Sequence, residues 1–249
     1  MKLIVLGSGT CVPSLSRSAP GYFLTAGDKQ LLIDIGSTVP QQLVKAGRSG
    51  FEIDAVFITH THPDHVSGLS PFLHSLTSTP GKTRVKELYL VGPPGIKEYY
   101  NRCICSIQGP PKTFPVTVIE MKEVFELAPF HILGTKTVHT ANSMAFRFFR
   151  NNKSVVFTGD CDFDQGLISF SRTAELLVID CSFPNDMKTR GHLTPKECAL
   201  VAKEAGVKKV VLTHIYPSPA PENLRLEEYR AIFTGEVVLA RDLLEIDIQ

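Results

Sequence analysis

The stretch Thr59-His60-Thr61-His62-Pro63-Asp64-His65 places three imidazoles and a carboxylate directly after the apolar run Ala55-Val56-Phe57-Ile58. The apolar run predicts a buried strand that ends at the histidines. His60 and His62 have the period-two spacing that puts both imidazoles on one side of an extended backbone. Pro63 holds His62 extended and can open a helix, which would place Asp64 and His65 at its start. The pattern therefore predicts four metal ligands gathered around one point.

The number of metal ions follows from how the ligands are delivered. Two histidines on a single helix would serve one zinc ion, whereas ligands from a strand end and from a helix start can serve two. The alternative is that these imidazoles are ordinary loop side chains, as a lone histidine usually is. So many ligand-type side chains within six residues favour the metal site.

Length and charge set limits on the kind of protein. With 249 residues and 43% hydrophobic content, the chain is long enough for one large domain with a substantial core. No linker or low-complexity stretch divides it, so residues 1–249 are expected to form one domain. The net charge of +1 gives no general basic field for nucleic acid, so a polyanionic substrate would have to be held by local patches.

The N-terminus and the cysteines bear on the compartment. After Met1-Lys2, the apolar run Leu3-Ile4-Val5-Leu6 is too short for a signal peptide, and no run approaches the length needed to span a bilayer. The six cysteines are scattered beside apolar strands, which is typical of reduced thiols rather than of a disulfide framework. We therefore expect a soluble protein of the cytoplasm.

Hydrophobic periodicity predicts the order of the elements. Strands alternate with helices as far as about residue 103, which indicates an α/β arrangement, and strands predominate from residue 116. Val66, Leu69, Leu73 and Leu76 recur at helical spacing, so residues 64–76 are expected to form one amphipathic helix on the core.

Further ligand-type side chains follow apolar strands elsewhere in the chain. Asp160 comes after Phe157-Thr158-Gly159, His214 ends the apolar strand at residues 209–213, and His139 lies in a loop-like stretch. Taken alone, His139 would usually be a surface or core histidine and Asp160 a turn residue. Asp34 ends another apolar strand, where an unpartnered carboxylate is costly. It is expected to make a cap or loop hydrogen bond, or else to support a metal-bound histidine.

A well-marked helix start follows His192. Thr194 is placed as the N-cap, Pro195 as the first helical residue, and Glu197 closes a capping box. Gly206 ends the predicted helix. His192 therefore lies just ahead of a helix N-terminus, where anions are favoured.

Together, these motifs resemble those of the metallo-β-lactamase-fold hydrolases over essentially the whole chain. The nearest resemblance is to the ribonuclease Z branch and its phosphodiesterase relatives, through Gly7-Ser8-Gly9-Thr10, Gly92-Pro93-Pro94-Gly95, His192-Leu193-Thr194 and Thr213-His214. The resemblance implies a four-layer αββα sandwich, an α/β fold with the site at the strand ends between two sheets.

The resemblance also implies roles for individual residues. The first metal ion would be held by His60, His62 and His139, the second by Asp64, His65 and His214, and Asp160 would bridge them. Asp64 and His192 would be the catalytic residues. Imidazole and carboxylate ligands suit zinc, with manganese and iron as alternatives. The resemblance further implies a homodimer.

The expected activity follows from these ligands. Two metal ions would share a bridging hydroxide and neutralise the oxygens of a phosphodiester. The leading hypothesis is a phosphodiesterase, ribonuclease Z-like, acting on RNA ends or on small cyclic or linear phosphodiesters. The alternatives are a hydrolase of carboxylic esters, lactones or thioesters, and a ligand-binding relative without activity. The ligand-binding relative is disfavoured because no ligand is missing.

Two departures argue against maturation of transfer RNA. Members that process transfer RNA usually carry a long arm between the positions of His139 and Asp160, and here that interval is the size of a hairpin. Their Gly-Glu-Gly-Thr sequence is Gly36-Ser37-Thr38-Val39 in this chain.

Overall fold

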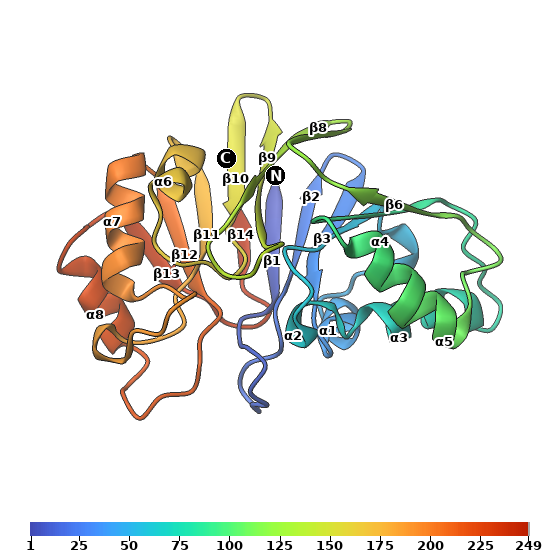
Figure 1. The fold of residues 1–249 in the computed structure, drawn as a ribbon, viewed down its shortest axis with the longest axis horizontal. Helices are drawn as coiled ribbons and strands as arrows, with labels where there is room; N and C mark the ends of the chain where they lie inside the picture. Colours follow the sequence, from blue (N-terminus) through green and yellow to red (C-terminus); the bar gives the residue numbers. More distant parts are fainter. Residues whose placement is uncertain (249) are drawn as a thin grey trace.

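Two seven-stranded β-sheets pack face to face in the computed structural model, which describes residues 1–248 (Figure 1). The first sheet has the order β14-β1-β2-β3-β4-β5-β6 and the second the order β13-β12-β11-β10-β9-β8-β7. The strands of the first sheet are β1 (Lys2–Gly7), β2 (Gly21–Ala26), β3 (Lys29–Ile35), β4 (Ala55–Phe57), β5 (Leu88–Gly92), β6 (Val116–Glu120) and β14 (Glu245–Asp247). Those of the second are β7 (Val124–Leu127), β8 (Phe130–Lys136), β9 (Met144–Arg150), β10 (Lys153–Phe157), β11 (Leu176–Asp180), β12 (Lys209–Thr213) and β13 (Glu236–Leu239).

Helices cover the outer face of each sheet, as Figure 1 shows on its two sides. The helices on the first sheet are α1 (Val39–Lys45), α2 (Pro63–Val66), α3 (Leu69–Ser78), α4 (Ile96–Tyr99) and α5 (Ser106–Gln108). The second sheet carries α6 (Gln165–Ser171), α7 (Pro195–Ala205) and α8 (Leu224–Arg230). None of the helices within residues 1–248 is long and apolar enough to cross a membrane.

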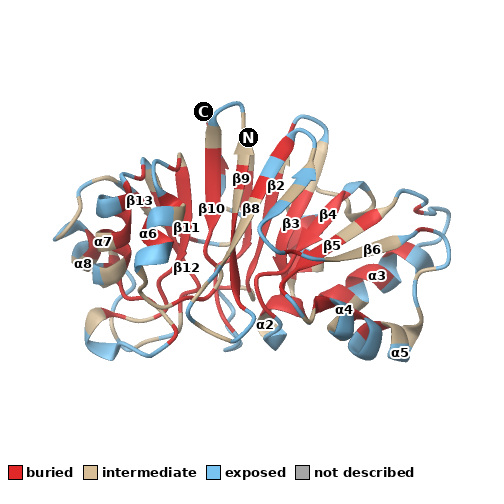
Figure 2. Ribbon diagram, turned by 45° about the horizontal axis from the view of Figure 1, so that its top comes forward, coloured by how far each residue is buried: buried red, intermediate tan, exposed pale blue. Residues whose placement is uncertain are grey.

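The central strands, such as β3 and β11, are buried on both faces because each sheet lies between its helices and the other sheet, as the colouring of Figure 2 shows. In β3, Leu31 and Ile33 face the core between the sheets, whereas Leu32 and Ile35 face the helical layer. This explains the near-continuous apolar sequence of β3. Between the sheets, Phe57 of β4 meets Phe148 of β9 edge to face, with ring centroids 5.0 Å apart.

Parallel pairing places strand ends from both sheets at the same edge. Strands β3 to β6 pair in parallel in the first sheet, and β10 to β13 pair in parallel in the second. The carboxyl ends of parallel strands meet at one sheet edge, and ligands bind there in open α/β sheets. The two sheets can therefore contribute side chains to a shared site.

The single helix predicted over residues 64–76 was wrong. The chain forms α2 and α3, which are interrupted at Ser67 and Gly68. The nitrogen of Gly68 donates to the carbonyl oxygen of Ile35 at 2.9 Å, and a Cβ on Gly68 would lie 2.3 Å from the carbonyl oxygen of Gly36. This close approach to the end of β3 requires a glycine and ends the first helical turn. The break leaves the segment that carries Asp64 and His65 held against β3.

Candidate metal centre

Strand ends and one helix start deliver the predicted ligands. His60 follows β4, Asp160 follows β10 after a two-residue turn, and His214 directly follows β12. His62 is the N-cap residue of α2 in an extended conformation, as predicted from Pro63. These segments are far apart in the sequence, and the fold brings their side chains together.

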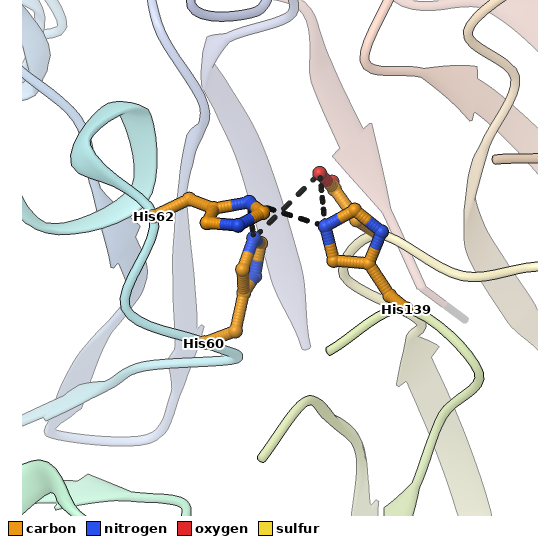
Figure 3. A group of neighbouring side chains, drawn as sticks. His60, His62 and His139 are labelled. Carbon is orange, nitrogen blue, oxygen red and sulfur yellow. Dashed lines mark hydrogen bonds and ion pairs between the residues drawn. The ribbon is translucent and has the colours of Figure 1, made fainter. Parts of the chain in front are cut away.

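The first group of ligands consists of His60, His62, His139 and Asp160. Nδ1 of His62 lies 2.9 Å from Nε2 of His60 and 3.1 Å from Nε2 of His139. Oδ2 of Asp160 lies 3.7 Å from Nε2 of His60 and 3.6 Å from Nε2 of His139. Figure 3 shows the three imidazoles turned toward one another. One ligand atom from each residue lies within 4.8 Å of all the others, so the group could hold a metal ion.

The second group of ligands consists of Asp64, His65 and His214, with Asp160 beside them. Oδ2 of Asp64 lies 3.4 Å from Nε2 of His214 and 3.7 Å from Nε2 of His65. Oδ1 of Asp160 lies 3.3 Å from Nε2 of both His65 and His214. The two oxygens of Asp160 therefore face different groups, which is the geometry required of a bridging carboxylate.

Two atoms in this cluster lack partners. Nε2 of His65 and Oδ1 of Asp160 are buried and make no hydrogen bond within residues 1–248. Leaving a buried polar atom without a partner costs on the order of 1–3 kcal/mol, so each of these two atoms is expected to have a partner that is not part of the chain. A divalent cation between these groups would satisfy both atoms at once. The donor set of imidazole nitrogens and carboxylate oxygens thus fits a metal site.

The charges in the cluster also suit a cation. Burial raises the pKa of Asp160, but the imidazoles of His214 and His65 outweigh it and hold that pKa well below its usual range. Burial is the largest influence on His60 and lowers the pKa of its ring. The cluster thus offers an ionised carboxylate and a neutral imidazole, the forms that bind metals.

Four imidazoles are turned in the same way by hydrogen bonds on Nδ1. Nδ1 of His65 donates to Oδ2 of Asp34 at 2.8 Å, and Nδ1 of His139 donates to the carbonyl oxygen of Gly191 at 2.9 Å. Nδ1 of His60 faces Oγ1 of Thr59 at 3.1 Å, and Nδ1 of His214 faces Oγ of Ser182 at 3.0 Å. With Nδ1 occupied, Nε2 of each ring is left as the electron-pair donor toward the cluster. His62 is the exception, because its Nδ1 points inward.

Asp34 resolves the alternatives left open by the sequence. Besides His65, it accepts hydrogen bonds from the nitrogen and the hydroxyl group of Thr59, each at 2.8 Å. Its carboxylate is 1% exposed. Asp34 therefore both supports a candidate ligand and fixes the turn that carries His60.

His192 lies against the second group without joining the predicted ligands. Its ring stacks on that of His214, with centroids 5.4 Å apart and an interplanar angle of 12°. Nδ1 of His192 faces Oδ2 of Asp180 at 2.9 Å and Oγ of Ser182 at 3.1 Å. Burial lowers the pKa of His192, but the hydrogen bond that Nδ1 donates to Asp180 and the charge of that carboxylate raise the pKa above its usual value. The interaction with Asp180 thus favours the protonated ring and directs Nε2 away from that carboxylate.

Two side chains outside the capping box fix the orientation of the His192 ring. The capping box of Thr194 and Glu197 is present at α7, as predicted. The ring itself is held by Asp180 and Ser182, which the sequence did not single out. Asp180 ends the apolar strand β11 just as Asp34 lies near the end of β3, and that shared position was the available signal.

Lys188 fastens the loop that precedes α7. Its Nζ donates to Oδ1 of Asp162 and to the carbonyl oxygen of His192, each at 2.6 Å, and to Oε2 of Glu197 at 2.7 Å. Oδ2 of Asp162 accepts from the nitrogen of Gly191 at 2.8 Å. Gly191 has a φ of +88°, and a Cβ there would lie 3.0 Å from Nδ1 of His139. This loop therefore positions both His139 and His192. The two remaining histidines, His74 and His131, are exposed and lie elsewhere.

Known proteins match the chain over nearly its full length. The model of the family described as anti-Pycsar protein Apyc1 matches residues 1–237. The probable metallo-hydrolase YhfI of Bacillus subtilis is 30% identical over 248 residues, covering 97% of each chain. The crystal structure of YhfI aligns with a TM-score of 0.87 at 27% identity, over 98% of each chain.

Ribonucleases of the same fold are also similar. A ribonuclease Z of Archaeoglobus fulgidus is 25% identical over 306 residues, covering 99% of this chain and 97% of that enzyme. The short form of human tRNase Z has the same fold, with a TM-score of 0.82 at 24% identity and full coverage of both chains. The ribonuclease alignment is longer than the 249 residues of this chain, so that enzyme contains residues without a counterpart here.

The fold, the histidine and aspartate cluster and these relatives define a metal-dependent hydrolase of the metallo-β-lactamase fold, confirming the predicted class and its α/β, four-layer αββα architecture. That fold implies divalent metal ions. Within the class, the chain belongs to the family described as anti-Pycsar protein Apyc1.

Proposed function

We propose that this hydrolase is a binuclear phosphodiesterase and that residues 1–249 act as one domain. His60, His62 and His139 hold the first ion, while Asp64, His65 and His214 hold the second. Asp160 would serve both ions, which is supported by the 3.3–3.7 Å separations of its two oxygens from four imidazoles. Zinc suits this donor set best, with manganese and iron as alternatives.

The chemistry divides between the ions and the protein. Bound divalent ions supply Lewis acidity that activates water near neutral pH and offsets the charge of a phosphodiester. Asp160 contributes the negative charge that allows two cations to lie close together. Asp64, with a side chain 9% exposed, faces the open side of the second group and orients the reacting groups there. Asp34 and Gly191 keep His65 and His139 in the ring orientations this role requires.

The observation that carries the phosphodiesterase proposal is the Asp180–His192 pair beside His214. A protonated His192, with Nδ1 held by Asp180, can donate from Nε2 to a non-bridging phosphate oxygen or protonate the leaving group. A carboxylic ester has no second non-bridging oxygen for such a donor to bind. Hydrolysis of carboxylic esters, lactones or thioesters is the alternative, because the same activated water can attack a carbonyl group.

The substrates proposed are small cyclic or linear phosphodiesters, or RNA ends, rather than precursor transfer RNA. The interval between His139 and Asp160 contains only the β9–β10 hairpin, so the arm of transfer-RNA-processing members is missing. The similarity to proteins named ribonuclease Z keeps RNA ends among the candidates.

Two assays test this function. Purified, zinc-reconstituted protein should hydrolyse bis(p-nitrophenyl) phosphate and leave lactones and p-nitrophenyl esters unchanged. The reverse preference would replace the proposal with the ester hydrolase. If the protein binds two ions per chain and hydrolyses none of these substrates, the result would favour a ligand-binding protein without activity.

Two further features are proposed, the first by family resemblance and the second from the cysteines. The protein is a homodimer, and light scattering at the monomer mass of 27.4 kDa over a range of concentrations would reject this. It acts in the cytoplasm, which is supported by the free state of all six cysteines. Export of the native protein from its source cells would contradict that location.

A further inference from the structure

A hollow of about 160 Å³ lies beside the candidate metal centre. Tyr216 forms part of its wall, and the ring of Tyr216 lies 5.6 Å from that of His214, measured between centroids. The opposite wall comes from residues 9–17, whose Thr10, Val12, Ser14 and Arg17 also line a second hollow that reaches Asp64. A ligand that contacts the metal centre can therefore extend into the first hollow.

An arginine with unused hydrogen-bonding capacity lines this hollow. Arg225 of α8 is 1% exposed. Its Nη2 donates to the carbonyl oxygens of Ser182 and Tyr216, both at 3.1 Å. Within residues 1–248, its buried Nε has no hydrogen-bond partner, and its guanidinium forms no ion pair with a carboxylate. A buried charge without a counter-ion is costly, so a partner outside the described chain is expected.

Two other buried arginines show how this chain satisfies such a charge. Arg17, in the same hollow, is neutralised by Glu222, whose two carboxylate oxygens accept at 3.0 and 2.9 Å. Arg84, on the far side of the first sheet, also has an unpaired Nε and no carboxylate partner within residues 1–248, but it uses both Nη1 and Nη2 on carbonyl oxygens and lies over the ring of Phe114. Arg225 has neither a carboxylate nor a second set of carbonyl acceptors. Since Arg17 and Glu222 cancel, the hollow retains one positive charge.

The remaining lining is suited to an oxyanion. Ser14, Ser16 and Ser218 contribute hydroxyl groups to the walls, and guanidinium with hydroxyl groups is the usual donor set for phosphate. We propose that this hollow binds a second phosphate group of the substrate while the scissile phosphodiester lies at the metal centre. The inference rests on the proposed function and narrows it to phosphodiesters that also carry a phosphomonoester, such as a dinucleotide with a terminal phosphate.

Three uridine dinucleotides test the proposal: UpU, pUpU with a 5′-phosphate, and UpUp with a 3′-phosphate. The wild-type protein should have a kcat/KM for one of the phosphorylated forms at least about tenfold above that for UpU, the effect of one charge-assisted interaction. Arg225→Gln should bring this ratio to about one. Because Arg225 also holds Ser182 and Tyr216, general damage would lower all three rates together and leave the ratio unchanged.

Two pairs of variants separate charge from structure. Ser16→Asp adds a negative charge to the lining of the hollow and should lower the ratio several-fold, whereas Ser16→Asn, the neutral counterpart of that aspartate, should keep most of it. Arg84→Gln removes a comparably buried arginine and should leave the ratio unchanged. Arg225→Lys keeps the charge and should retain part of the preference.

Failure of this inference can be told apart from failure of the phosphodiesterase proposal. Equal kcat/KM for all three dinucleotides would overturn the second phosphate site while leaving phosphodiester hydrolysis intact. If the reconstituted protein hydrolyses none of them, calorimetric affinities for UpU, pUpU and UpUp provide the same comparison. Equal affinities, or a preference that survives both Arg225→Gln and Ser16→Asp, would also overturn it.

Discussion

The two groups of ligands differ in how deeply they lie. The first group includes His62, which is exposed, and His139, which is partly buried. In the second group, His65 is 1% and His214 is 3% exposed, and Asp34 supports His65 from behind. Exposure makes exchange of an ion easier, whereas burial with fixed hydrogen bonds strengthens its retention. The second group is therefore expected to hold its ion more tightly than the first, and Asp160 is the residue that joins the two.

The largest effect is expected from the residue common to both groups. Asp160→Ala should abolish turnover and reduce the affinity of both ions, because Asp160 is the one carboxylate within residues 1–248 whose two oxygens approach both sets of imidazoles. Metal content and bis(p-nitrophenyl) phosphate hydrolysis measure this, with circular dichroism as the check on folding. A folded variant with both ions and normal turnover would remove Asp160 from its assigned role.

Loss of His192 should lower turnover without changing the metal content of either group. His192→Ala should keep both ions and lower kcat for phosphodiesters by roughly a hundredfold or more, because the lost donor acts mainly on the transition state. Asp180→Asn should lower kcat less, because it keeps His192 and weakens only the carboxylate that holds its Nδ1. The same carboxylate accepts from Cys161 and Ser182, so the metal content of this variant has to be measured as well. Wild-type turnover of His192→Ala on several phosphodiesters would return the protein to the broader class of two-metal hydrolases.

A substitution of Asp34 should affect the metal affinity of the buried second group more than that of the exposed first group. An asparagine there would present an amide donor to Nδ1 of His65, which would move the ring proton to Nε2 and block that ligand atom. Asp34→Asn is expected to weaken the binding of the second ion by about 10- to 100-fold. The first ion should be weakened less, because the amide oxygen of asparagine can still accept from the nitrogen of Thr59 and hold the turn that carries His60. Competition with a chelator, followed by metal analysis, measures both affinities. Selective loss of the first ion would contradict the assignment of His65.

Substitution of Lys188 should lower kcat by a smaller factor, through the loop that positions His139 of the first, more exposed group. Lys188→Met removes three hydrogen bonds that fasten the loop of His192 and Gly191, so kcat should fall by about tenfold or less with both ions retained. Lys188→Arg should restore part of the rate. If neither variant changes kcat, or if only the second ion is lost, the loop does not position His139 and His192.

A buried carboxylate outside both groups should change stability alone. Burial raises the pKa of Asp54, but hydrogen bonds from Lys86, Gln30 and Lys29 outweigh it and lower that pKa. A lowered carboxylate pKa stabilises the fold above the unfolded-state value of about 4, and this contribution is lost as the pH falls through the folded-state pKa. Asp54→Asn should therefore lower Tm at neutral pH, with a difference that shrinks below about pH 4. Metal affinities should be unchanged, which also makes it a control for Asp34→Asn.

Local patterns in the sequence predicted the α/β arrangement and the candidate ligands of residues 60–65, whereas the four-layer sandwich was implied by the family resemblance. The apolar run before His60, the spacing of His60 and His62, and the capping box before α7 can each be recognised within a few residues. The capping box was confirmed by the structure. The resemblance supplied His139 and Asp160, which local pattern alone would have left as ordinary loop residues.

What the sequence did not predict depends on contacts between distant segments. Asp180 supports His192 across a gap of twelve residues, and Lys188 meets Asp162 across 26. No periodicity marks such contacts. The break between α2 and α3 was missed for the same reason, because Gly68 is required by its approach to Gly36, 32 positions earlier in the chain.

The number of metal ions per chain tests the central claim most directly. After reconstitution with zinc and removal of excess metal, mass spectrometry under native conditions should find two ions per chain in the wild-type protein. Gradual chelation should remove the ions one at a time, and the ion of the first group, which contains the exposed His62, should be lost before that of the second. For the same reason, His62→Ala should yield a protein with one ion. One ion or none in the reconstituted wild-type protein would contradict the binuclear site and the mechanism that depends on it.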